Sequence, residues 1–176
     1  MIYTIGHSTR KEEDFLRLLK HYSIQLLADV RTIPKSRWNP QFQKARLEKS
    51  LPAAGIEYVH VPKLGGLREP SGKSIHQGLK NPALQGYADH MQTAEFEEAL
   101  KHLIQLSQKQ TVAIMCAEAD YRKCHRQLTS DALKVNGVEV IHIVSLEETN
   151  PHIVTPSARV TGKKITYPGP QTKLEF

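Results

Sequence analysis

The part of the chain richest in chemistry begins at Cys116. This cysteine follows four apolar residues typical of a strand, and Cys124, His125 and Arg126 follow it at the expected start of a helix. Helix-terminal N–H groups and neighbouring cations lower the pKa of a thiol and favour the nucleophilic thiolate. We therefore expect Cys116 to be a nucleophile or a redox thiol, with Glu118 orienting a histidine or acting as a second acid/base.

Proton transfer and anion binding have candidates in three further places. His125 or His7 would transfer protons, because imidazole titrates near neutral pH. The turn that carries His7 and Ser8 lies between an expected strand and an expected helix, where backbone N–H groups can hold an anion. Arg31, which ends a second apolar run, and Arg126 would bind anionic groups through their guanidinium ions. For the turn, a plain capping role for Ser8 is the alternative.

Two adjacent glycines and one carboxylate complete the set of candidates. Gly65 and Gly66 follow a third apolar run, and glycine allows a ligand to approach the backbone closely. A tight turn would also require them. Asp29 precedes Arg31 by two residues, and for Asp29 we favour a structural ion pair.

The cysteines also allow readings other than nucleophilic catalysis. Cys116, Cys124 and His125 are ligand types that zinc accepts, although adjacent cysteine and histidine rarely bind one tetrahedral ion. A reversible Cys116–Cys124 disulfide would make the protein a redox sensor, and inert buried thiols are the third alternative.

A cysteine and an arginine six positions apart also match the loop of cysteine-dependent phosphatases. In such loops the backbone and the arginine surround a phosphoryl group while the thiolate attacks. The segment from Cys116 to Arg122 lacks that pattern's glycines, and Glu118 and Asp120 within it would repel a phosphate dianion. We treat this match as accidental.

Basic charge is concentrated in three segments of the 176-residue chain, whose net charge is +6. Residues 31–50 include six basic residues and one acidic residue, and residues 63–80 and 151–176 each include four basic and one acidic. Such clusters attract phosphate-bearing partners, which points to a nucleotide or a nucleic acid. Solvated loop charge is the alternative, since residues 31–50 offer only Trp38 and Phe42 as aromatic rings for stacking.

Apolar runs alternate with amphipathic segments along the chain, which predicts a single-domain α/β fold. We expect a mostly parallel five-stranded sheet with helices on both faces, because several runs are continuously apolar. The domain would span residues 1–149, with residues 150–176 as a basic C-terminal extension packed on it. The expected strands are 2–5, 26–30, 56–61, 111–115 and 138–144, with an edge strand near 165–167. The expected helices are 11–22, 41–53, 84–92, 94–108 and 123–135.

Several classes of protein are excluded by composition. No apolar run approaches the roughly 20 residues of a membrane-spanning helix, and the first residues do not form a signal-peptide core. Two cysteines cannot form a disulfide scaffold. We therefore expect a soluble cytoplasmic protein without a membrane partner.

The chain resembles an uncharacterised family catalogued as domain of unknown function 488. Five motifs carry the resemblance in order over about residues 1–145: Thr4-Ile5-Gly6-His7-Ser8, Asp29-Val30-Arg31 followed by Pro34, Leu64-Gly65-Gly66, Met115-Cys116-Ala117-Glu118 and Cys124-His125-Arg126. The resemblance brings no established activity, but it emphasises the candidate residues within these motifs.

Together these features predict a small cytoplasmic enzyme that uses a Cys/His/Arg site on a phosphate-bearing substrate, at the carboxyl edge of the sheet. The alternative is a non-catalytic module that binds nucleic acid, binds a metal or senses redox state. Zinc is the one cofactor that the residues suggest.

Overall fold

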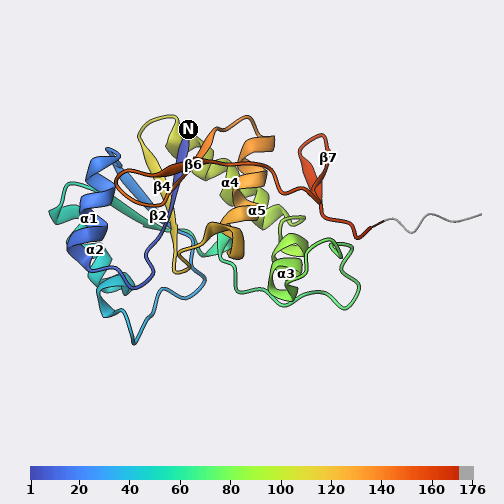
Figure 1. The fold of residues 1–176 in the computed structure, drawn as a ribbon, viewed down its shortest axis with the longest axis horizontal. Helices are drawn as coiled ribbons and strands as arrows, with labels where there is room; N and C mark the ends of the chain where they lie inside the picture. The colour runs from blue at the N-terminus through green and yellow to red at the C-terminus, as the bar shows by residue number, and fades with distance from the viewer. Residues whose placement is uncertain (171–176) are drawn as a thin grey trace, which may run out of the picture.

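The computed structural model describes residues 1–170, and a six-stranded sheet forms the centre of the fold (Figure 1). Its strands, in chain order, are β1 (Ile2–Gly6), β2 (Leu26–Asp29), β3 (Glu57–His60), β4 (Val112–Cys116), β5 (Val140–Ile143) and β6 (Thr149–Pro151). In space their order is β3-β2-β4-β1-β5-β6, and only β6 runs antiparallel to its neighbour. The carboxyl ends of the five parallel strands therefore lie along one edge.

Helices cover both faces of this sheet (Figure 1). The α-helices are α1 (Glu12–His21), α2 (Lys44–Ala53), α3 (Pro82–His90), α4 (Ala94–Ser107) and α5 (Arg126–Val135), with short 3-10 helices η1 (Pro40–Phe42), η2 (Pro62–Leu64) and η3 (Tyr121–Lys123). All five residues of β4 are buried, as expected for a continuously apolar strand with helices on both sides.

The two faces have separate hydrophobic cores. Phe15 and Leu19 of α1 and Leu51 of α2 pack on one face, while Phe96 of α4 and Leu128 of α5 pack on the other. The chain therefore leaves β1 toward one face and leaves the adjacent β4 toward the opposite face. In parallel α/β proteins this divergence opens a crevice at the carboxyl ends of the two strands, where ligands bind.

The structure confirms the predicted α/β fold and mostly parallel sheet, with three differences in detail. The sheet has six strands rather than five, because the chain after β5 folds back and pairs as β6. The expected edge strand near 165–167 is instead β8 (Lys164–Thr166), which pairs with β7 (Arg159–Thr161) in a separate hairpin. The expected helix over 41–53 is divided into η1 and α2.

The segment after β6 contributes buried side chains. His152 Nε2 lies 2.7 Å from Asp131 Oδ1, and the Tyr167 hydroxyl donates to Asp131 Oδ2 at 2.8 Å. The predicted basic extension over 150–176 continues past the described residues, since its last six positions lie outside them. Within residues 1–170, no helix has the length and apolar character needed to cross a membrane.

Candidate functional site

A pocket of about 640 Å³ lies at the carboxyl ends of β1, β2 and β4, at the predicted crevice. Its lining comes from the loops after these three strands, from the loop after β3 and from the residue that precedes α5. Of the residues proposed from the sequence, it is lined by His7, Ser8, Arg31, Gly66, Cys116, Glu118 and His125.

Three proposed site residues do not line this pocket. Cys124 lies behind Cys116 and is 5% exposed. Gly65 is buried against Thr32, close enough that a Cβ atom at residue 65 would overlap the Thr32 hydroxyl and lie 2.7 Å from its amide nitrogen. Arg126 is 1% exposed and donates to backbone carbonyls of Glu118 and Ala119. The expectation that Arg126 contacts substrate therefore does not match its buried position.

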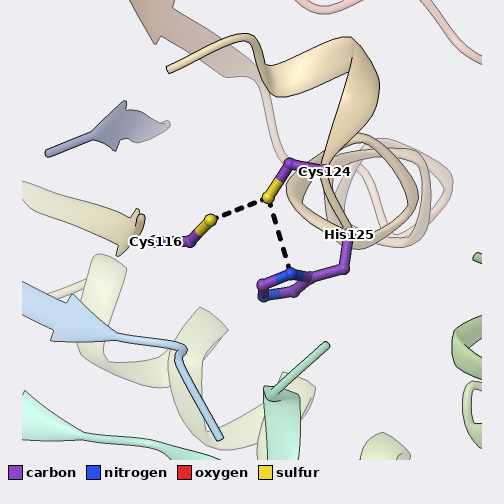
Figure 2. A group of neighbouring side chains, drawn as sticks. All are labelled: Cys116, Cys124 and His125. Carbon is purple, nitrogen blue, oxygen red and sulfur yellow. Dashed lines mark hydrogen bonds between the residues drawn. The ribbon is translucent and has the colours of Figure 1, made fainter. Parts of the chain in front are cut away.

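The two thiols and one imidazole form a compact cluster (Figure 2). Cys116 ends β4, and Cys124 and His125 directly precede α5. The Sγ atoms of Cys116 and Cys124 lie 2.8 Å apart, and Cys124 Sγ lies 3.5 Å from Nδ1 of His125. The backbone amide of Glu118 donates to Cys116 Sγ at 3.4 Å. Only Cys116 and His125 of the cluster reach the pocket wall.

The contact between the sulfurs separates the pKa values of the two thiols. The hydrogen bond with Cys116 and the nearby Arg126 guanidinium lower the pKa of Cys124 to about 7. The same bond, together with burial, raises the pKa of Cys116 well above its ordinary value. The proton of Cys116 is therefore held more tightly than the proton of Cys124.

Arg126 supplies a buried positive charge behind this pair. Its Nη1 donates to Thr4 Oγ1 at 3.3 Å, and its Nε has no hydrogen-bond partner among the described residues. No carboxylate within residues 1–170 forms an ion pair with it. A buried charge is costly unless an opposite charge compensates it. The Cys124 thiolate is the anion that the site offers.

His125 is oriented by a contact with the second strand. Its Nε2 lies 3.0 Å from the Val30 carbonyl oxygen, which can only accept a hydrogen bond, so Nε2 carries the proton. Nδ1 is then an unprotonated acceptor that faces Cys124. Burial lowers the pKa of His125 and keeps the ring neutral. Gly66 makes room for this ring, because a Cβ atom there would overlap Nδ1 and Cγ of His125.

His7 and Arg31 interact with each other at the pocket floor. His7 Nδ1 donates to the Ser8 carbonyl at 2.8 Å, and His7 Nε2 accepts from Arg31 Nη1 at 3.1 Å. Burial lowers the pKa of His7 to about 4. With both ring nitrogens engaged, His7 has no free nitrogen for proton transfer. Arg31 is also paired with Asp29 at 2.5 Å, which agrees with the structural role favoured for that carboxylate.

The turn after β1 does not offer the backbone donors that its sequence suggested. The amides of His7 and Ser8 donate to the carbonyls of Cys116 and Ala117, each at 2.9 Å. These N–H groups join the β1 and β4 loops and are not available to an anion. Ser8 itself adopts a left-handed backbone conformation, with φ of 49°, and lines the pocket with its side chain.

The resemblance to a phosphatase loop is accidental, as expected. The Arg122 guanidinium is exposed and donates to Asp120 at 2.8 Å. It does not line the pocket that Cys116 faces. Glu118 does line this pocket, so a carboxylate stands beside the thiol.

The sequence indicated the loop after β2 only through the basic charge of residues 31–50 and did not indicate its individual pocket residues. Thr32, Ile33, Lys35, Ser36 and Asn39 all line the pocket. Their signal was positional: a long loop interrupted by prolines follows a buried strand at its carboxyl end, where ligands bind in this fold class.

The fold and the pocket define a parallel α/β protein with a dithiol–imidazole cluster at the carboxyl edge of its sheet. The profile of one family, described as Domain of unknown function DUF488, matches residues 11–133. The chain belongs to this family. Among the curated proteins and the solved structures, no significant match to the chain was found.

Proposed function

We propose that the protein is an enzyme that acts on a phosphate-bearing substrate, a nucleotide or a nucleic acid, with Cys116 as its reacting thiol. The observation that carries this proposal is the pairing of a pocket-facing thiol with a second thiol that can accept its proton. Cys116 lines the pocket, and Cys124, whose pKa is about 7, has its Sγ 2.8 Å from the Sγ of Cys116. Catalysis by a thiol requires its deprotonation during attack.

In the proposed step, the S–H bond of Cys116 breaks and its proton moves to the Cys124 thiolate. The sulfur electron pair then forms a bond to the electrophilic atom of the substrate, and the leaving group departs with the electrons of its former bond. Nδ1 of His125 lies 3.5 Å from Cys124 Sγ and can accept a hydrogen bond from the Cys124 thiol once it carries the proton. Glu118, on the pocket wall, would protonate the leaving group or activate water.

The cations and hydroxyl groups of the pocket support a phosphate-bearing substrate. Lys35 lines the pocket and forms no ion pair with a described residue, and Arg31 retains one N–H bond on Nη1 that its protein partners leave unused. The side chains of Ser8 and Ser36 add hydroxyl groups. Arg31 is largely neutralised by Asp29, so Lys35 is the stronger source of attraction for an anion.

A metal site is the second candidate, favoured by the tautomer of His125. A histidine that binds a metal through one nitrogen usually donates from the other to a carbonyl or carboxylate, as His125 does to Val30. Zinc accepts two thiolates and one imidazole, and the three ligand atoms lie within 4.8 Å of one another. Tetrahedral zinc, however, holds two sulfurs roughly 3.8 Å apart. The 2.8 Å separation between Cys116 and Cys124 therefore favours interacting thiols.

The close sulfurs also support the redox alternative. A peroxide would oxidise the Cys116 thiolate to a sulfenic acid and release hydroxide. The Cys124 thiol would then form a disulfide with it and release water. Such a reaction inactivates a thiol nucleophile and is compatible with the enzyme that we propose.

Protection of Cys116 from alkylation tests the proposed function. We expect a nucleoside monophosphate to slow iodoacetamide labelling of Cys116 in a saturable manner, because the ligand fills the pocket that gives access to the thiol. The corresponding nucleoside should protect at least about tenfold less well, since it lacks the charged group that Lys35 attracts.

Labelling is followed by mass analysis of the peptide that contains Cys116. Lys35→Ala should abolish most of the protection, whereas Lys109→Ala, which removes a lysine that does not line the pocket, should preserve it. Equal protection by the nucleoside and its phosphate, or protection unaffected by Lys35→Ala, would contradict a phosphate site.

A further inference from the structure

A tryptophan projects from the mouth of the pocket with almost no protein contact. Trp38 is 91% exposed, in the loop between β2 and η1. The amide of Asn39 donates to Ser36 Oγ at 2.9 Å, and this bond folds residues 36–39 into a turn. Ser36 and Asn39, on either side of Trp38, both line the pocket. The fold therefore holds a large aromatic ring in solvent beside the entrance to the site.

Two other apolar side chains are exposed at the same entrance. Ile33, from the same loop, is 57% exposed, and Leu67, from the loop after β3, is 69% exposed. Both line the pocket, together with the buried Arg31 and the exposed Glu118. Exposed apolar side chains beside charged groups suit a ligand with flat apolar parts and charged parts.

The charge beside Trp38 indicates the kind of ligand. Lys35 and Arg37 are both exposed, and neither forms an ion pair with any carboxylate among residues 1–170. An acidic peptide would satisfy these charges but would leave the flat indole without a matching surface. Nucleic acid supplies both phosphates and flat bases. In a duplex the bases are already stacked, whereas a single strand leaves their faces free for aromatic side chains.

We propose that the substrate is single-stranded nucleic acid, in which one base stacks on Trp38 while Lys35 and Arg37 contact the neighbouring phosphates. This inference rests on the proposed function, because it places the adjoining nucleotide in the pocket beside Cys116. The pocket volume of about 640 Å³ is within the range of sites for molecules of nucleotide size.

Tryptophan fluorescence tests this proposal directly, because Trp38 is the only tryptophan in the chain. Titration of the full-length protein with an oligothymidylate of about ten nucleotides should quench the fluorescence in a saturable manner. A duplex of the same length should quench little at equal concentration. In a separate anisotropy measurement with a fluorescein-labelled oligothymidylate, Trp38→Ala should bind about tenfold more weakly than the parent, and Trp38→Phe should recover part of the loss.

Matched control variants test whether binding depends on this surface or only on the total number of exposed apolar and basic side chains. Val160→Ala alters an exposed apolar residue in the β7–β8 hairpin, at the other end of the molecule from the loop after β2, and should not change binding (Figure 1). Lys35→Ala with Arg37→Ala should reduce the slope of log K against log salt by about 1.4 units. Lys163→Ala with Lys164→Ala, in the same hairpin, should leave the slope unchanged.

The proposal is overturned if oligothymidylate causes no quenching, if a duplex binds equally well, or if Trp38→Ala binds like the parent. The last two results would assign binding to charge alone. Binding is read from Trp38, and this measurement is independent of the labelling of Cys116. Retained binding with an unreactive Cys116 would reject the proposed chemistry and keep the surface. If Cys116 is reactive and is protected by a nucleoside monophosphate, but oligothymidylate does not quench Trp38, the proposed chemistry would be kept and the proposed binding surface rejected.

Discussion

Replacing Cys116 by serine is expected to lower kcat/KM at least about a thousandfold for a phosphate-bearing substrate found by the protection assay. Serine is a much weaker acid than cysteine, so the Cys124 thiolate cannot deprotonate it near neutral pH. The fold should tolerate the change, because the serine hydroxyl can keep the contacts with the Glu118 amide and with Cys124. Turnover is measured for both proteins, together with their thermal unfolding.

Cys124→Ser serves as the matched control for this prediction. It keeps the pocket-facing thiol but removes the proton acceptor, so activity should fall strongly near pH 7 and recover in part at higher pH. If Cys116→Ser retained turnover while Cys124→Ser lost it, the assignment of the reacting thiol would be wrong. Equal and full activity in both variants would place the chemistry elsewhere.

Gly6→Ala is expected to destabilise the protein by about 3 kcal/mol. Gly6 ends β1, and the loop after β4 crosses directly over it. A Cβ atom on residue 6 would overlap the carbonyl oxygen of Glu118 and lie 2.9 Å from Cα of Ala119. These are backbone atoms, which cannot move aside as a flexible side chain would, so the loop that follows Cys116 must shift. The midpoint of thermal unfolding should fall by about 6–12 °C.

Gly72→Ala is the control, because a Cβ atom at residue 72 meets nothing within 4 Å. It should change the unfolding midpoint by no more than about 2 °C. We also expect Gly6→Ala to alter the labelling rate of Cys116, since the displaced loop adjoins that thiol. An unfolding midpoint for Gly6→Ala equal to that of Gly72→Ala would contradict the close packing of this loop.

The sequence specified the central strands well because each of them is a short apolar run between helical segments. β4 is the clearest case, with every residue buried. β6 was not predicted because Thr149–Pro151 is short, partly exposed and contains a proline, so that no apolar run marks it in the sequence. The hairpin of β7 and β8 has the same cause, since each of its strands has three residues and most of them are exposed.

The site could be predicted in outline from one rule, that ligands bind at the carboxyl ends of parallel strands. This rule placed Cys116, Glu118 and Arg31 around one pocket, as found. It could not show which way Arg126 points, because the buried position of its guanidinium depends on Thr4 and on the loop after β4. Likewise, the engagement of both His7 nitrogens depends on partners that only folding brings near.

The cytoplasmic location and the nucleic-acid or nucleotide partner expected from the sequence stay predictions, as does the packing of the basic extension. They do not bear on the central claim, which concerns the two thiols. That claim is that Cys116, a buried residue that lines the pocket, is a reactive thiol whose proton is taken by Cys124.

The most direct test is the pH dependence of alkylation at Cys116 and Cys124, resolved by peptide mass mapping on native protein with and without a chelator. We predict that Cys116 is labelled first and that its rate rises through about pH 7, the value to which its neighbours lower the pKa of Cys124. In Cys124→Ser this rise should move to higher pH, because burial alone then disfavours the Cys116 thiolate. The chelator should make no difference. Thiols that stay unreactive until the chelator is added would instead show a bound metal, and thiols unreactive under all conditions would show inert packing; either result would contradict a nucleophilic Cys116.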